Sequence, residues 1–366
     1  MSQFLSRIEL ALGETTDPER RGDLHIKKAL YLARRGEFGD AKQIAQALRR
    51  NLPVERYPRI RIQIILLDGV VDLYESLSSH SYDRIKGSDL LAIAFGDREL
   101  ISITSSWRAH VEFERSNFDE MGMALLRVQR AAEENSHEPR ARVARILADC
   151  FALTGDRSQS KKWFEIAHRH AVGIGDQAMI DALIYNSMAF GLSRLRSESF
   201  TNNVDVAKLR LIETELSSAK TFQSLIGAKA LVNLVDICSA RLLMLKGDFQ
   251  GALNYLNVTT DSGPWAKNNS SADLWRLELA FCEAKVGNID AAIRSVSQIE
   301  DNSLPGIDVD DRLAGAWMAN EMALLDSRLG SVAVTSINLE RVKREFELYF
   351  FGLSQAIAGF EIKAST

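Results

Sequence analysis

Proline is scarce in this chain of 366 residues. Only six prolines occur, and a proline inside a helix costs about 3 kcal/mol. All six fall in expected turns or helix starts: Pro18, Pro53, Pro58, Pro139, Pro264 and Pro305. This placement predicts a protein that is almost wholly helical.

Cysteine is equally rare. Cys150, Cys238 and Cys282 lie far apart in apolar helical runs and form no C-x-x-C pair. We expect buried, reduced thiols, which are typical of cytosolic proteins. Residues 1–12 lack the clean apolar region of a signal peptide, and no uninterrupted apolar run is long enough to span a membrane. The expectation is therefore a cytoplasmic protein without membrane contacts.

Common catalytic and cofactor motifs are absent too. The sequence has no H-E-x-x-H, no phosphate-binding G-x-x-x-x-G-K-[ST], no G-x-S-x-G and no dinucleotide-binding glycine motif. His168 and His170 are two residues apart on an expected helix and so point in different directions, while His137 stands alone. The acidic residues at 308–311 lack the glycine and distal glutamate of a calcium loop. We expect no enzyme, no metal and no cofactor.

Strong charge of one sign is missing as well. The net charge of −4 gives no general attraction to nucleic acid or to acidic membranes. The two ends differ, because residues 1–60 hold 12 basic and 8 acidic groups and residues 301–366 hold 6 and 10. Either these are solvated faces that differ by chance, or they steer a partner or a second copy of the chain. A homodimer through the charged ends or the terminal helices stays open.

What the chain does contain is a repeated corner between helical runs. Glycine can end a helix in the left-handed conformation, and the polar residue after it can cap the next helix. The corners begin at Gly36, Ser116, Gly155, Gly247, Gly287 and Gly330. An alanine stands seven residues before each of them, at Ala29, Ala109, Ala148, Ala240, Ala280 and Ala323. A small residue at one fixed place predicts close approach of a neighbouring helix.

The spacing of the corners is regular. Successive corners are 39 residues apart from 116 to 155, 40 from 247 to 287 and 43 from 287 to 330. The gaps of 80 and 92 residues that remain each correspond to two units, with degenerate corners expected near residues 79–82 and 198–200. A fixed period of this size indicates stacked helical hairpins.

These corners, with an alanine early in the second helix such as Ala41 or Ala252, resemble the tetratricopeptide repeats (TPRs). The helix-A tryptophan is mostly missing, and the period is longer than the 34 residues of the standard repeat. The chain is therefore similar to the longer-helix variant in bacterial regulatory proteins. The resemblance implies an all-α, right-handed α-solenoid of about seven to eight TPR-like hairpins at residues 17–336, with capping helices at 1–16 and 337–366.

The resemblance also implies which residues face the concave groove. In that family they lie about 13, 10, 9, 6, 3 and 2 residues before the turn glycine. The candidate binding residues chosen here are Trp107, His110, Arg142, Arg145, Asp149, Tyr185, Met188, Arg241, Trp317 and Asn320. Arginine together with tryptophan and tyrosine is typical of binding surfaces. We expect Arg142 and Arg145 to be exposed, with Asp149 holding Arg145; the alternative is burial between the layers of long repeats.

The fold resembled here implies a non-catalytic scaffold or adaptor that binds a peptide or helix of a protein partner in its groove. An acidic or carboxylate-ended peptide is favoured, because arginine can hold a carboxylate with two hydrogen bonds. The alternative is a regulatory sensor whose solenoid changes curvature on binding a peptide or small ligand and controls a separate output protein. Trp265, in the expected loop 258–273, and the apolar last helix are further candidate contact surfaces.

Overall fold

The computed structural model describes residues 2–76, 80–200, 204–230, 232–261, 272–299 and 308–365. Throughout these ranges the secondary structure is α-helix with two short 3-10 helices, Val54–Arg56 (η1) and Ser327–Leu329 (η3), and no strand. The predicted all-α solenoid is therefore confirmed. Trp265 lies outside the described residues, and so does the first part of the degenerate corner expected at residues 79–82.

The helices alternate along the chain as the sequence pattern predicts. In order they are α1 (Gln3–Glu14), α2 (Pro18–Arg34), α3 (Phe38–Asn51), α4 (Pro58–Ser76), α5 (His80–Phe95), α6 (Arg98–Glu114), α7 (Phe118–Ala131), α8 (His137–Thr154), α9 (Arg157–Ile174), α10 (Gln177–Ser199), α11 (Val206–Ile226), α12 (Val232–Leu245), α13 (Phe249–Asp261), α15 (Ala272–Lys285), α16 (Ile289–Val296), α17 (Val309–Leu325) and α18 (Val332–Ser365). The degenerate corner expected at 198–200 coincides with the end of α10.

The corners have the backbone geometry that the sequence indicates. The four corner glycines other than Gly330 have φ between 77° and 88°, for example 82° at Gly36 and 88° at Gly155, and Ser116 takes φ 59° in the same role. Gly36 also needs to be glycine for a second reason. A Cβ on it would lie 2.4 Å from the backbone nitrogen of Ala230, which donates a hydrogen bond to the carbonyl of Arg35.

The alanine seven residues before each corner is buried in every case: Ala29, Ala109, Ala148, Ala240, Ala280 and Ala323. Ala240 lies in a core cluster with Ala252, Leu253 and Leu256, so α12 and α13 approach each other across two small residues. The close packing predicted from the repeated alanines is confirmed at these positions.

Replacing Ala240 with leucine is expected to lower the free energy of unfolding by about 1–3 kcal/mol, because extra methylenes in a filled core force neighbouring side chains off their rotamers. Chemical denaturation measures the loss. Ala333→Leu, an exposed alanine on α18, is the matched control and should change stability by less than about 0.5 kcal/mol. Equal midpoints for the two variants would contradict the close-packing role.

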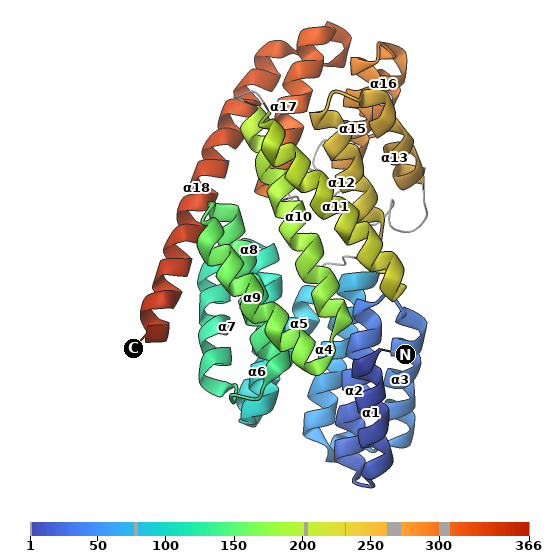
Figure 1. The fold of residues 1–366 in the computed structure, drawn as a ribbon, viewed down its shortest axis with the longest axis vertical. Helices are drawn as coiled ribbons and strands as arrows, with labels where there is room; N and C mark the ends of the chain where they lie inside the picture. Colours follow the sequence, from blue (N-terminus) through green and yellow to red (C-terminus); the bar gives the residue numbers. More distant parts are fainter. Residues whose placement is uncertain are drawn as a thin grey trace. The chain divides into compact units, whose positions relative to one another are not determined.

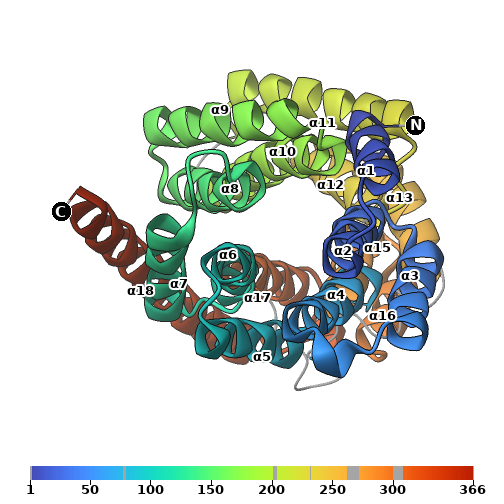
Figure 2. The same ribbon diagram turned by 90° about the horizontal axis from the view of Figure 1, so that it is seen from below.

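The chain divides into two compact units. Unit 1 contains residues 1–184, 222–231 and 353–366, and unit 2 contains residues 185–221 and 232–352. In unit 1 the first helices of four hairpins, α2, α4, α6 and α8, lie on the inner side, and their second helices, α3, α5, α7 and α9, lie outside (Figure 2). α1 packs on this unit through Phe4, Ile8 and Leu12 against Tyr31 of α2 and Ala178 of α10.

Unit 2 is built from the same kind of hairpin. α10, α11 and α12 share a core cluster with Leu192, Ile212 and Val235 (Figure 1). α15, α16 and α17 share another, centred on Phe281 and Met318, and α17 packs on α18 through Leu313 and Val342. Each hairpin therefore contacts its neighbours in sequence, as in a repeat protein.

The cysteines, the hydropathy of the helices and the metal-ligating side chains complete the description of the fold. All three cysteines are free thiols and buried, as predicted. None of the described helices is both long and apolar enough to span a membrane. The described residues also contain no group of three or more histidine, cysteine and acidic side chains placed to hold a metal ion.

Candidate functional site

Three inner helices of unit 1, α4, α6 and α8, meet at Trp107, on α6. The guanidinium carbon of Arg142, on α8, lies 3.7 Å from the centre of the Trp107 ring, and Tyr74, on α4, packs edge-on against the same ring at 6.3 Å. Arg142 also donates a hydrogen bond to the hydroxyl of Ser106. Trp107 and Arg142, which the sequence offered as candidates from two different repeats, therefore lie in contact.

Arg145, one helical turn after Arg142, is held by two partners. Its Nη1 lies 3.0 Å from Asp149 Oδ2, as the sequence predicts, and its Nη2 lies 2.7 Å from His110 Nδ1. A guanidinium can only donate, so Nδ1 of His110 accepts and the imidazole carries its proton on Nε2. Burial, followed by the positive charges of Arg145 and Arg142, lowers the pKa of His110 well below its usual range.

A third arginine joins from α2. Arg34 Nη1 lies 2.8 Å from Asp176 Oδ2, and both side chains are almost fully buried. Asp176 also caps α10, because its Oδ1 accepts a hydrogen bond from the backbone nitrogen of Met179. Together, these groups form the unit 1 arginine cluster: Arg34, Trp107, His110, Glu138, Arg142, Arg145, Asp149 and Asp176.

Arg142 is the charged member of this cluster whose hydrogen bonds are least satisfied. Its Nη2 is buried and has no hydrogen-bond acceptor in the described part of the chain; Glu138 Oε1 is 3.5 Å away. Burial, together with the positive charges of Arg34 and Arg145 and against the effect of Glu138, lowers the pKa of Arg142 to about 10. The guanidinium remains charged at neutral pH, in surroundings that would be improved by one more anion.

The expectation that Arg142 and Arg145 are exposed in an open groove is wrong. Their exposed fractions are 1% and 6%, and those of Trp107, His110 and Asp149 are also below 9%. The physical reason is that α2, α4, α6 and α8 lie so close that their groove-facing side chains pack on one another. The alternative of burial between layers is the one observed.

Unit 2 contains a second cluster, the unit 2 arginine cluster, made of Arg196, Arg241, Glu278, Asp310 and Asp311. Glu278 Oε1 lies 2.8 Å from Arg196 Nη1 and 2.8 Å from Arg241 Nε, and the glutamate is fully buried. Asp311 pairs with both arginines, at 3.2 Å from Arg241. Two guanidinium groups from α10 and α12 are therefore clamped by carboxylates from α15 and α17.

Asp310 and Asp311 are neighbours in this cluster, but their surroundings shift their pKa values in opposite directions. Burial and the charge of Asp311 raise the pKa of Asp310, which hydrogen-bonds to Ser193. Burial also acts to raise the pKa of Asp311, but Arg241 and Arg196 outweigh it and lower that pKa below its usual range. Of these two aspartates, Asp311 therefore stays ionised beside the two arginines and Asp310 takes up a proton more readily.

The remaining predicted binding residues of unit 2 lie apart from these charges or make structural contacts. Trp317 stacks on Phe200 with ring centres 4.7 Å apart. The side-chain oxygen of Asn320 accepts hydrogen bonds from the hydroxyls of Thr335 and Ser336, which ties α17 to α18. Tyr185 and Met188 pack in the apolar cluster of α10, α11 and α12. Of the unit 2 residues predicted, Arg241 is the one that joins the arginine cluster.

Several members of the two clusters escaped the sequence analysis. Arg34 stands two residues before Gly36 and Glu278 nine residues before Gly287, so the groove offsets applied to those two repeats would have selected both. Asp176 lies outside the positions that the groove offsets select, although it both caps α10 and pairs with Arg34. Arg196 and Asp311 carry no such signal, because no regular corner lies at those distances after them.

His137, interpreted from the sequence as standing alone, is in fact paired with His170. Their Nδ1 atoms are 3.0 Å apart, so one ring must donate a proton and the other accept it. The two residues come from α8 and α9 of unit 1, and their separation of 33 positions gave the sequence no way to bring them together.

No family model and no curated protein matches the chain. Among solved structures, the chain is similar to a Rap protein determined in complex with competence and sporulation factor, with a TM-score of 0.56 and 13% sequence identity, over 90% of this chain and 99% of the other. This likeness establishes that the protein has the TPR-like helical-repeat fold found in that Rap protein.

Proposed function

We propose that the protein is a non-catalytic scaffold that binds a peptide segment of a partner along the inner helices of unit 1, with the unit 1 arginine cluster as the contact for a carboxylate. The observation that carries the proposal is Arg142, a buried cation whose Nη2 has no hydrogen-bond acceptor in the described residues. A buried charged donor without a well-aligned hydrogen-bond acceptor costs on the order of 1–3 kcal/mol, and the ion pair with Glu138 at 3.5 Å offsets only part of that cost. A ligand carboxylate would remove that cost.

The neighbours of Arg142 fit the same role. Trp107 offers a flat ring, and Arg34 and Arg145 add positive charge within the same set of inner helices. Arginine holds a carboxylate with two parallel hydrogen bonds, and tryptophan and arginine are the residues that most often dominate binding energy. The structural likeness to a Rap protein that was solved with a bound factor is in keeping with a binding function.

The test is a screen of short peptides against the whole chain, each made with a free C-terminal carboxylate and as its amide. We expect the free acids that bind to do so at least about tenfold more tightly than their amides, the equivalent of about 1.4 kcal/mol. Arg142→Gln should remove this preference. Arg127→Gln, on the outer helix α7 where the arginine pairs with Asp89, is the matched control and should retain it.

The peptide titrations are interpreted only for variants that are folded. Circular dichroism establishes that each variant is helical before titration, and the comparison of acid with amide on the wild type needs no variant at all. The absence of binding by any peptide, or equal binding of acids and amides, would overturn the proposal.

One observation favours the second candidate function, a sensor that changes curvature. The inner arginines already have partners within the chain, as in the pair of Arg34 with Asp176, so a ligand that takes their place must alter contacts between helices. Binding would then be coupled to helix spacing, and a separate protein could read the change. X-ray scattering with and without a bound peptide separates the two, because a plain scaffold keeps its radius of gyration.

A further inference from the structure

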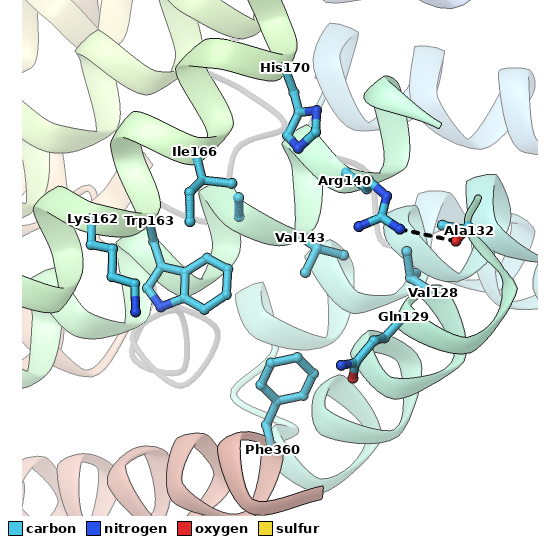
Figure 3. Close-up of a pocket in the computed structure, with 11 residues that line it drawn as sticks. Val128, Gln129, Ala132, Arg140, Val143, Lys162, Trp163, Ile166, His170 and Phe360 are labelled. Carbon is cyan, nitrogen blue, oxygen red and sulfur yellow. Dashed lines mark hydrogen bonds between the residues drawn. The ribbon is translucent and has the colours of Figure 1, made fainter. Parts of the chain in front are cut away.

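A separate pocket of about 470 Å³ opens in unit 1 between α7, α8, α9 and the end of α18. Figure 3 shows Trp163 and Phe360 beside the hollow, with Lys162 next to Trp163 and Arg140 on the other side near His170. The volume falls within the range of small-molecule sites. None of the residues of the unit 1 arginine cluster lines this pocket.

The lining is aromatic and aliphatic, with cations at its edges. Val128, Val143 and Ile166 add to the two rings, and no acidic residue is among the described residues that line the pocket. An apolar hollow bordered by uncompensated positive charge suits a ligand with an apolar body and a negative end.

Hydrogen-bond donors in the pocket are left over. The indole Nε1–H of Trp163 is buried and has no acceptor in the described chain. Arg140 donates through Nε to the carbonyl of Glu133 and through Nη2 to that of Ala132, which leaves its Nη1 without an acceptor among the described residues. Lys162 lies over the Trp163 ring at 6.0 Å and forms no ion pair with any described carboxylate. Three donors therefore border the pocket, and an anion can accept from them.

We propose that this pocket binds a small aromatic carboxylic acid. The ring of the ligand would pack between Trp163 and Phe360, and its carboxylate would accept from Lys162 and from the Trp163 indole. A monocarboxylate fits better than a phosphate, because the donors are few and most of the lining is apolar. The site is independent of the peptide-binding proposal, since it uses other residues and the opposite side of α8 from Arg142 and Arg145.

The experiment uses calorimetric titration of the full chain with 2-naphthoate, and with 2-naphthamide as a neutral ligand of the same shape. We expect the acid to bind at least about fivefold more tightly than the amide, because it forms charge-assisted hydrogen bonds. Lys162→Gln should reduce that ratio to about two or below. Lys161→Gln, its exposed neighbour outside the pocket, is the matched control and should leave the ratio unchanged.

A second variant fixes the location. Val143→Phe places a ring in the hollow and should abolish binding of both ligands while the melting temperature stays equal or rises, because a void is filled. Equal affinity for acid and amide, no binding of the acid, or binding that survives Val143→Phe in a folded protein would each overturn the proposal.

Discussion

Asp176→Asn is expected to lower the free energy of unfolding by about 3–5 kcal/mol, the usual cost of breaking a buried ion pair. The amide keeps the size of the side chain and an oxygen that can still cap α10 by accepting from Met179. What it removes is the negative charge 2.8 Å from Arg34, in a pair whose side chains are only 4% and 1% exposed. Arg34 would be left as an uncompensated buried cation. Chemical denaturation followed by circular dichroism measures the loss.

Two companion variants separate the ion pair from general damage. Combining Asp176→Asn with Arg34→Met should recover most of the loss, since replacing both members of a buried pair is often close to neutral. Glu75→Gln removes the charge from the exposed pair of Glu75 with Lys42 in the same unit and should cost less than about 1 kcal/mol. If the two single changes at Arg34 and Asp176 simply add in the double variant, the pair is not coupled and the prediction fails.

Glu278→Gln is expected to have an effect of comparable size, about 3–5 kcal/mol, in unit 2. One carboxylate oxygen of Glu278 accepts from both Arg196 and Arg241, and the side chain is fully buried. The change therefore takes the shared counter-charge from two guanidinium groups at once and leaves them to repel each other, with Asp311 as their remaining firm partner.

Hydrogen exchange read by mass spectrometry places this effect in the chain. α10, α12 and α17 should lose protection in Glu278→Gln, because their charged residues meet at that carboxylate. Glu321→Gln removes a half-exposed glutamate that lies 3.4 Å from Lys285 and serves as the control, with an expected change below about 1 kcal/mol. Equal protection in the two variants would mean that Asp311 alone holds both arginines.

The fold was predictable because its signals are local. A glycine such as Gly155, at the end of α8, indicates where a helix ends, and Asp156 directly after it caps the next helix. The alanine at a constant distance before each corner states where helices touch. These features recur in each repeat, so the interpretation of Gly247 and Ala240 also applies to the other repeats.

The candidate site was predictable only in part, because its key property depends on distance across repeats. The offsets from the corners chose Trp107, Arg142 and Arg145, and these do lie together. An inner helix face is open or filled depending on how tightly successive hairpins curve. This curvature is the sum of many small packing angles, and no short stretch of sequence encodes it. Arg34 and Asp176 meet although 142 positions separate them. Because contacts over such a separation leave no local signal, the sequence predicted an exposed groove where the structure has a packed interior.

The carbonyl of Arg35 accepts hydrogen bonds from the backbone nitrogens of Lys229 and Ala230, and Phe360 lines a pocket whose other walls come from α7, α8 and α9. A ribosome that adds 5–20 residues per second reaches residue 360 on the order of ten seconds or more after residue 170 has emerged. During that interval the first four hairpins exist without segments that complete their unit, and apolar surface meant for Phe360 faces the nascent-chain environment. Unit 1 therefore completes its folding late, although most of it is synthesised first. Ending the chain before residue 353 would remove a segment that belongs to unit 1, and not a detachable tail.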